Sequence, residues 1–233
     1  MMLVELFAGT RSVSKAFERK GIETHSIEFD TRHENIDWYE DINKVSAQDI
    51  VDRFGIPDVL WASPPCQSYS VAAIGHHREK LKDGTLGPKT DFARASDKLL
   101  LHVLDIINDL TKMNPKLIWF IENPRAGMRK MRCMQQLPRY TICYCKYGFP
   151  YQKATDIWTN HPNPQFKPTC KAGDPCHEKA PRGTRNGLQG VNGKVDRSRI
   201  PDEFCDHIAE ICMAIPQDIK PMPKYHQSTL DVI

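Results

Sequence analysis

Two residues in this 233-residue chain have side chains suited to covalent chemistry and stand directly after apolar runs. Cys66 follows the run DVLWAS and two prolines, and Glu122 closes the run LIWFI. A cysteine is usually a buried small hydrophobe, but this one lies on a rigid turn among polar residues. A helix N-terminus or a nearby cation would lower its pKa and make it a nucleophile. Glu122 should be partly buried, with a raised pKa that suits proton donation.

A second group of residues suits a nucleoside cofactor. The small turn Ala8–Gly9–Thr10 follows the first apolar run and lets a ligand approach the backbone, and an acid after the next run, Glu28 or Asp30, suits a ribose diol. The turn is not G-x-G-x-x-G and offers no phosphate cradle. An adenosyl cofactor without phosphates, such as S-adenosylmethionine, therefore fits better than NAD. The alternative is a tight strand-to-helix turn with no ligand.

These side chains need a scaffold, and the apolar pattern predicts one in which strands and helices alternate. A helix over 46–54 has Ser46 as its N-cap, and Gly21 ends the first helix. The pattern is typical of a doubly wound α/β sheet, in which ligands bind beyond the carboxyl ends of the strands. The predicted strands are 2–7, 23–29, 58–63, 117–123, 140–148 and 155–160, the last two forming an edge hairpin; the predicted helices are 13–21, 46–54, 99–110 and 201–215.

Length and composition favour one domain. A chain of 233 residues with 40% hydrophobic content can bury one substantial core, so we expect residues 1–233 to form a single catalytic domain. Residues 161–200 are rich in Pro, Gly and charge and predict an irregular basic insert. No apolar stretch of about 18 residues and no leader are seen, so we expect a cytoplasmic protein that does not enter a membrane.

Basic residues are concentrated in two segments, although the net charge is only +3. Residues 124–140 carry five basic residues and no acidic one, and residues 177–199 carry six basic residues against two acidic ones. Each segment alone is typical of a solvated loop. Together they favour a polyanionic partner.

The eight cysteines should be reduced thiols, because the chain shows no export signal. Cys143, Cys145, Cys170 and Cys176, with His177, could form a tetrahedral zinc site. Their C-x-C and C-x5-C spacings are looser than the standard zinc signatures. Ordinary reduced thiols are the preferred interpretation, and no metal is assigned.

Three motifs, LVELFAGTRSVSKAF, DVLWASPPCQSYS and FIENPR, resemble in order and spacing those of the DNA (cytosine-5) methyltransferases. The resemblance covers roughly residues 2–160 and implies the Rossmann-like sheet of class I S-adenosylmethionine-dependent methyltransferases. It implies that the Cys66 thiolate adds to C6 of cytosine, that Glu122 contacts N3 and the exocyclic amine, and that Asn123 holds the loop from Pro64 to Cys66. Residues 68–91 match the family's mobile loop over the nucleic acid.

The resemblance also implies binding residues. For the cofactor these are Phe7, Ala8, Gly9, Thr10, Glu28, Asp41, Ile42 and Pro64. Nucleic-acid contacts are expected from Gln67, Ser70 and Arg125, and also from Arg182, Arg185 and Gln189 of the insert, whose side chains suit base edges and phosphates. The alternative is an extended loop that only packs on the sheet.

This sequence departs from the family's pattern at two places. The family's Gln-x-Arg-x-Arg is replaced by YQKATDIW, in which Lys153 can align with the first arginine and Thr155 with the second. Arg125 or Lys153 would then supply the missing cation. The family's target-recognition domain is replaced by about 40 residues, 161–200.

The sequence therefore predicts a monomeric cytosine-C5 methyltransferase that flips a base out of double-stranded DNA. It would act in the cytoplasm of a bacterial cell or of a phage-infected host cell. Two alternatives stay open. One is an RNA cytosine-C5 methyltransferase with the same mechanism, and the other is a catalytically silent homologue that binds nucleic acid or a protein.

Overall fold

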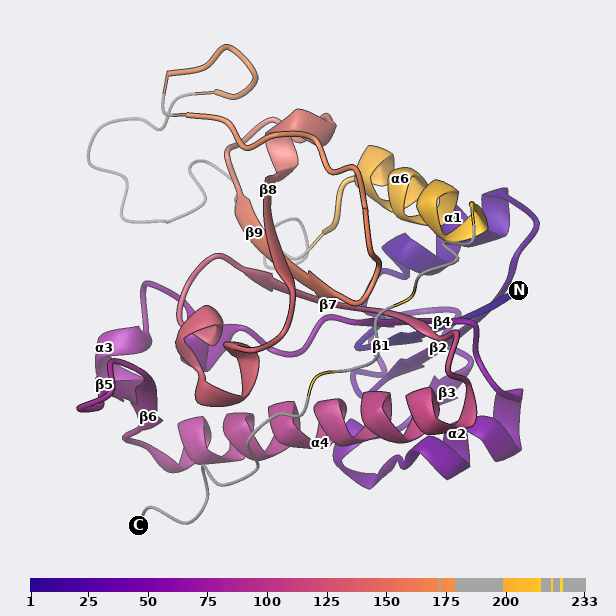
Figure 1. Ribbon diagram of the computed structural model, residues 1–233, viewed down its shortest axis with the longest axis horizontal. Helices are drawn as coiled ribbons and strands as arrows, with labels where there is room; N and C mark the ends of the chain where they lie inside the picture. Colours follow the sequence, from indigo (N-terminus) through magenta and orange to yellow (C-terminus); the bar gives the residue numbers. More distant parts are fainter. Residues whose placement is uncertain (172, 179–198, 215–218, 220–222, 224–233) are drawn as a thin grey trace.

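Figure 1 shows the computed structural model of the chain, which describes residues 1–171, 173–178, 199–214, 219 and 223. Within these residues, seven strands form one sheet. Five neighbouring strands, β3, β2, β1, β4 and β7, are parallel, and β9 is antiparallel to both of its neighbours, β7 and β8. The predicted doubly wound α/β sheet with an edge hairpin is confirmed. In spatial order the strands are β3 (Trp38–Tyr39), β2 (Glu23–Glu28), β1 (Met2–Leu6), β4 (Val59–Ala62), β7 (Ile118–Pro124), β9 (Ala154–Thr159) and β8 (Arg139–Cys143).

Helices cover both faces of the sheet (Figure 1). On one face α1 (Ser12–Arg19) packs beside α6 (Asp202–Met213), and on the other α2 (Ala47–Phe54) packs beside α4 (Asp91–Met113). Successive side chains of a strand point to opposite faces, so each strand supplies both cores. In β4, Trp61 packs with the α1 and α6 side, whereas Leu60 packs with the α2 and α4 side.

Local signals in the sequence set the helix ends. Ser46 caps α2 in a capping box with Asp49, in which each side chain accepts a hydrogen bond from the other residue's backbone N–H. Gly21 follows the C-cap of α1 with a φ of +74°, a left-handed conformation that favours glycine. Both predictions are confirmed. The short strand β3 is not predicted by the sequence pattern, because two residues show no period.

Residues 68–91 contain regular structure that the sequence does not predict. A short helix, α3 (Ile74–His77), leads into a hairpin of β5 (Arg78–Lys80) and β6 (Leu86–Pro88). The buried Arg78 guanidinium donates to Asp97 Oδ2 of α4 (2.7 Å) and to Ser68 Oγ (2.8 Å). This ion pair attaches the segment that follows Cys66 to the long helix.

The strand order brings three loops to one edge of the sheet. The chain leaves β1 for β2 on one side and later enters β4 on the other, which makes the junction of β1 and β4 the switch point. Leu6 pairs with Ala62, and Ala62 pairs with Ile121. The residues that follow these three strand positions therefore meet at the same place.

Among the residues that the structure describes, no helix is long and apolar enough to cross a membrane.

Candidate active site

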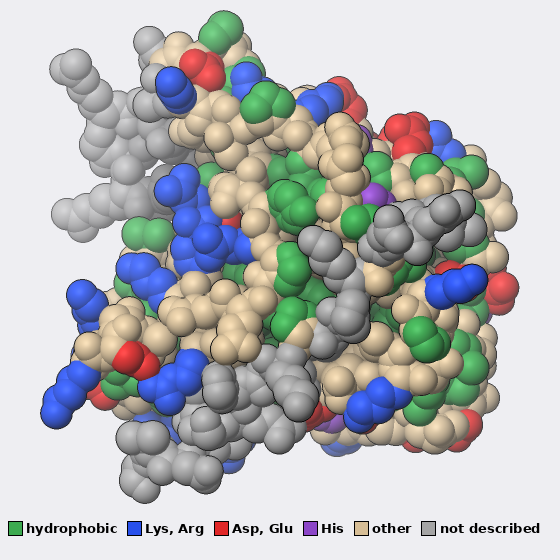
Figure 2. All heavy atoms as spheres, viewed as in Figure 1, with side chains coloured by type: hydrophobic (Ala, Val, Ile, Leu, Met, Phe, Trp, Pro, Cys, Tyr) green, Lys and Arg blue, Asp and Glu red, His purple; other side chains and the backbone are tan. Residues whose placement is uncertain are grey.

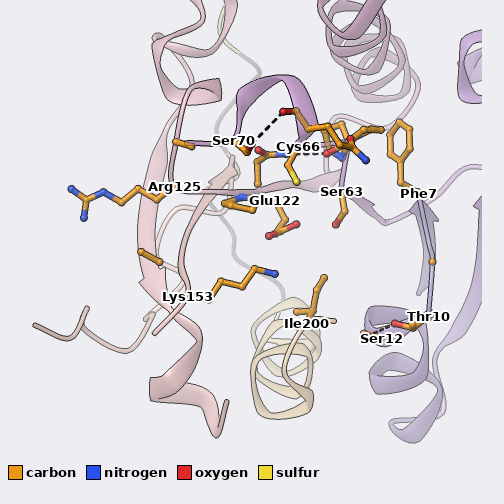
Figure 3. A pocket seen from close by; sticks show the side chains of 18 of the residues that line it. Phe7, Thr10, Ser12, Ser63, Cys66, Ser70, Glu122, Arg125, Lys153 and Ile200 are labelled. Atoms are coloured by element: carbon orange, nitrogen blue, oxygen red, sulfur yellow. Dashed lines mark hydrogen bonds between the residues drawn. The ribbon is translucent and has the colours of Figure 1, made fainter. Parts of the chain in front are cut away.

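A cavity of about 660 Å³ lies at this switch point (Figure 3), within the usual range of about 300 to 1,000 Å³ for small-molecule sites. Its wall is formed by residues that follow β1, β4 and β7 and by those that enter β9. The structure brings together here most of the residues that the sequence singles out. These are Phe7, Ala8, Gly9, Thr10, Pro64, Cys66, Gln67, Ser70, Glu122, Asn123, Arg125 and Lys153.

The turn after β1 is built from left-handed backbone. Phe7 has a φ of +58° and Gly9 a φ of +51°, so the chain reverses tightly between the strand and α1. The Gly9 N–H donates to Glu28 Oε2 (2.9 Å), and the other oxygen of Glu28 accepts from the Asp30 N–H (2.9 Å). Glu28 therefore holds the turn in its conformation from the end of β2.

Three predicted cofactor residues do not line the cavity. Glu28 lies behind the Gly9 turn, and Asp41 accepts a hydrogen bond from the Asn43 N–H (3.0 Å) as the cap of a short 3-10 helix. The Ile42 side chain is 2% exposed and belongs to the core beneath α2 and α4. The Ile42 side chain therefore does not line the cavity, and its contact with a cofactor stays a prediction.

Cys66 lies on the turn after β4, where its backbone is in the right-handed helical region just before the 3-10 helix Gln67–Tyr69. Asn123 Nδ2 donates to the carbonyl of Pro64 (2.9 Å), so the predicted contact between Asn123 and this loop is present. Burial and the charge of Glu122 raise the pKa of the Cys66 thiol, and the Lys153 cation only partly opposes them. The expected lowering of this pKa is therefore wrong, because burial disfavours the thiolate.

Glu122 and Lys153 form the charged centre of the cavity (Figure 3). Burial raises the pKa of the Glu122 carboxyl, against the opposing effects of Lys153 and of a hydrogen bond from the Tyr144 hydroxyl (3.0 Å). Burial lowers the pKa of Lys153, against the opposing charges of Glu122 and Cys66. The Lys153 ammonium also lies 4.8 Å from the Tyr144 ring centroid. The raised pKa predicted for Glu122 is confirmed in direction.

The two candidate cations point in different directions. In Figure 3 the Lys153 side chain points toward Glu122, whereas the Arg125 guanidinium points away from Cys66 and Glu122. Arg125 is exposed, and its backbone N–H pairs with the Ala154 carbonyl (2.9 Å). Thr155, aligned with the second family arginine, is fully buried behind this wall. Of the two residues aligned with the family's arginines, Lys153 therefore lines the cavity and Thr155 does not.

Tyr144 and Glu5 are among the residues of the site that the sequence pattern does not indicate. Tyr144 supplies the hydroxyl that binds Glu122, but its apolar surroundings in the sequence indicate only a strand residue. Glu5 lines the cavity from within β1, and its carboxylate accepts a hydrogen bond from the Ser14 N–H (2.8 Å). Burial raises the pKa of Glu5 to about 7. An acid inside the apolar run MLVELF is a signal that could have identified it.

The predicted nucleic-acid residues are only partly placed. Gln67, Ser70 and Arg125 line the cavity, and two of them, Gln67 and Arg125, are exposed. Arg182, Arg185 and Gln189 lie outside the described residues. Lys and Arg side chains gather on the side of the molecule that carries α3, β5 and β6 (Figure 2). Exposed members from the segments on this side are Lys80, Lys82, Lys89, Arg125 and Lys130.

The sequence profile described as C-5 cytosine-specific DNA methylase matches residues 1–137. A curated relative, a probable DNA (cytosine-5)-methyltransferase of Frog virus 3 (isolate Goorha), is 28% identical over 237 residues, which cover 91% of this chain and 100% of that protein.

Solved structures with a similar fold include two methyltransferases. The Dnmt2 methyltransferase of S. pombe is 13% identical with a TM-score of 0.45, and the Entamoeba histolytica methyltransferase EhMeth is 12% identical with a TM-score of 0.42. Each alignment covers 68% of this chain, and 48% and 52% of the respective neighbour. The chain thus spans about half the length of these solved structures.

Proposed function

Because this chain belongs to the C-5 cytosine-specific DNA methylase family, we propose that it transfers a methyl group from S-adenosylmethionine to C5 of cytosine in DNA. The reaction proceeds through a covalent bond between Cys66 and C6 of a flipped-out base. The observation that carries the proposal is that a thiol, a carboxyl and an ammonium, those of Cys66, Glu122 and Lys153, line one cavity at the switch point of the sheet.

The residues present fit an adenosyl cofactor. The part of the wall that comes from β1 and the following turn carries an aromatic ring, small residues and one acid, but no cationic side chain: Glu5, Phe7, Ala8, Gly9, Thr10 and Ser12. Such a surface suits a cofactor without phosphates, and the Glu5 carboxyl suits the positive sulfonium. S-adenosylmethionine, when bound, supplies the electrophilic methyl group.

The chemistry of the base is assigned to the other wall of the cavity. The Cys66 thiolate adds to C6 and breaks the C5–C6 double bond, so that C5 gains electron density. Glu122, whose raised pKa makes it easier to protonate, takes up a proton as the base binds, donates to N3 and stabilises the charge that develops on the ring. After methylation C5 loses its proton to solvent, the C5–C6 double bond re-forms as the bond between Cys66 and C6 breaks to regenerate the thiolate, and N3 returns its proton to Glu122.

Lys153 has an electrostatic role in this scheme. Its cation favours the ionised forms of both Cys66 and Glu122 and so opposes burial, which raises the pKa of each. Because the thiol of the unliganded protein is poorly ionised, substrate must enter before the thiolate accumulates. Burial is the largest factor that opposes thiolate formation, and the negative charge of Glu122 is the second. Protonation of Glu122 as the base binds removes this second factor.

The exposed basic side supports a nucleic-acid substrate. Lys80, Lys82, Lys89, Arg125 and Lys130 can contact phosphates around the cavity mouth, and Gln67 and Ser70 lie where a flipped base would enter. We also propose that residues 1–233 act as one catalytic domain, with 161–200 in place of a target-recognition domain. A monomeric state and a cytoplasmic location stay predictions.

The test is a covalent trap. Duplexes that contain 5-fluorocytosine in varied sequence contexts are incubated with the protein and S-adenosylmethionine, and adducts are resolved on denaturing gels and mapped by mass spectrometry. Fluorine at C5 blocks the loss of the C5 substituent, so a functional enzyme should trap itself at Cys66. Cys66→Ala should form no adduct, whereas Cys212→Ala, a buried cysteine of α6, should form it normally.

The same assay separates the alternatives. An adduct on 5-fluorocytosine RNA but on no DNA would replace DNA by RNA as the substrate. The absence of any adduct, in a protein shown by calorimetry to bind S-adenosylmethionine, would refute the proposed activity and favour a silent nucleic-acid-binding homologue.

A further inference from the structure

Four potential metal ligands meet beside the edge hairpin, away from the cavity. Cys145 lies in the 3-10 helix Tyr144–Tyr147 after β8, and Cys170, Cys176 and His177 lie in the segment that follows β9. The three sulfur atoms and one ring nitrogen all lie within 4.8 Å of one another. Cys143 contacts Cys145 and Cys170 but is not part of this group. We propose that Cys145, Cys170, Cys176 and His177 bind a structural zinc ion.

Four of the six distances between the ligand atoms are close to those of a tetrahedral Cys3His site, and the other two are no longer than 4.8 Å. With zinc–sulfur bonds of about 2.3 Å and zinc–nitrogen bonds of about 2.0 to 2.1 Å, ligand sulfurs lie about 3.8 Å apart and sulfur and nitrogen about 3.6 Å apart. Cys145 Sγ lies 3.3 Å from Cys170 Sγ and 3.7 Å from Cys176 Sγ. His177 Nδ1 lies 3.8 Å from Cys170 Sγ and 3.5 Å from Cys176 Sγ. A single ion can therefore reach all four atoms with little movement.

Groups around the cluster suit a bound metal. The Gln152 side-chain amide donates to Cys170 Sγ (3.2 Å), the kind of outer hydrogen bond that orients a thiolate ligand. Three thiolates and one neutral imidazole around Zn²⁺ leave one net negative charge. Lys146 places a positive charge beside the site, because its ammonium contacts Cys176; the same ammonium lies 3.9 Å from Asp174 Oδ2.

Four protein ligands leave no open position for substrate, so the ion has a structural role. The ligands come from two segments 25 residues apart at their closest pair, Cys145 and Cys170. The same two segments also meet where the Glu178 N–H donates to the Pro150 carbonyl (2.9 Å). The metal thereby fixes residues 150–153 from the side opposite the cavity, and Gln152 and Lys153 of this stretch line the cavity itself.

The first measurement is the zinc content of the purified wild-type protein, which does not depend on any activity. We expect about one zinc ion per chain by elemental mass spectrometry, retained through gel filtration. After removal of zinc by a chelator under reducing conditions, titration with Co²⁺ alone should give the intense visible absorption of a tetrahedral site and a sulfur-to-metal charge-transfer band.

Variants then test the ligand set. Cys170→Ala and Cys176→Ala should lose the metal, whereas Cys143→Ala, the neighbouring cysteine outside the set, should keep it. A wild-type protein without zinc that also fails to bind Co²⁺ would overturn the proposal. So would a disulfide between Cys145 and Cys170 in the protein as purified, detected as a mass lower by two hydrogens and located by mapping of the linked peptides. Retention of zinc by both ligand variants and its loss from Cys143→Ala would overturn the assignment of ligands.

Discussion

Replacement of Glu122 by Gln should make the Cys66 thiol more acidic and yet slow methylation. Gln keeps the shape of the side chain and can still accept the hydrogen bond from the Tyr144 hydroxyl. It removes the negative charge that, after burial, is the main factor that raises the pKa of Cys66, and it leaves the Lys153 cation to favour the thiolate. The two measured properties should therefore move in opposite directions.

The size of the shift follows from Coulomb's law. If a separation of about 6 Å is assumed for two unit charges in one cavity, they repel by about 3 kcal/mol at an effective dielectric constant of about 20. That energy corresponds to about 2 units of pKa, or about 100 times more thiolate at a pH below the pKa. A more acidic thiolate is intrinsically less nucleophilic, which offsets about tenfold of this gain. Alkylation of Cys66 should therefore be about 10 times faster, whereas turnover falls by about 100-fold or more because N3 loses its proton donor.

The assay measures both properties on one preparation. Iodoacetamide alkylation is followed across a pH series by mass spectrometry of the peptide that contains Cys66, without cofactor or nucleic acid. Single-turnover methylation is measured in parallel. Glu34→Gln, which makes the same change at an exposed position, is the matched control and should alter neither rate.

Two results would refute this reasoning. If the pH midpoint of Cys66 alkylation in Glu122→Gln stays within about 0.3 units of the wild type or rises, the charge of Glu122 does not control the thiol. If the midpoint falls but turnover is unchanged, Glu122 perturbs the thiol without serving as the proton donor to the base.

Further perturbations probe the same cavity and its support. Lys153→Met should raise the pKa of Cys66 and slow single-turnover methylation by about 10- to 100-fold, with partial recovery in Lys153→Arg; equal rates in all three proteins would exclude an electrostatic role. Burial raises the pKa of Glu5 from 4.5 to about 7, so the folded protein binds this proton more tightly than the unfolded chain and the free energy of unfolding falls as pH rises through that interval. Glu5→Gln should therefore be more stable than the wild type by up to about 3 kcal/mol at about pH 8 and show little gain at about pH 4.5, as measured by urea unfolding. Arg78→Met should lower the free energy of unfolding by about 3 to 5 kcal/mol because it leaves Asp97 charged and buried, and Asp97→Leu in the same protein should restore part of it; a change below about 0.5 kcal/mol would contradict a stabilising ion pair.

Much of the fold could be predicted from the sequence because its signals are local. Apolar runs of strand length alternate with periods of helix length, and residues such as Ser46 and Gly21 mark helix ends through their own backbone preferences. The position of the cavity followed from the same pattern, since parallel strands place Cys66 and Glu122 at one edge.

What the sequence did not supply depends on contacts between distant residues. The hydrogen bond between Tyr144 and Glu122 joins positions 22 residues apart, and nothing in an apolar strand pattern indicates which tyrosine turns inward. The direction of the pKa of Cys66 was predicted wrongly because it depends on burial and on the Glu122 charge, neither of which a motif contains. The hairpin that begins at Arg78 also has no recognisable signal in the sequence, because its two strands have only three residues each and show no period.

The edge hairpin links the two sites. Strand β9 is preceded by Lys153 on the cavity side, and β8 ends next to Cys145 on the side of the proposed zinc site. A lysine in place of the family's arginine pair has fewer hydrogen bonds to fix its position, because an ammonium is a flexible point charge whereas a guanidinium is a planar fork. The side chain of Gln152, the residue before Lys153, donates to the proposed zinc ligand Cys170. A bound metal would therefore restrict the backbone that carries Lys153. Loss of zinc should therefore reduce methylation through the position of Lys153, and the Cys66 thiol should become less acidic in the metal-free protein, a shift that alkylation of the folded chain can detect.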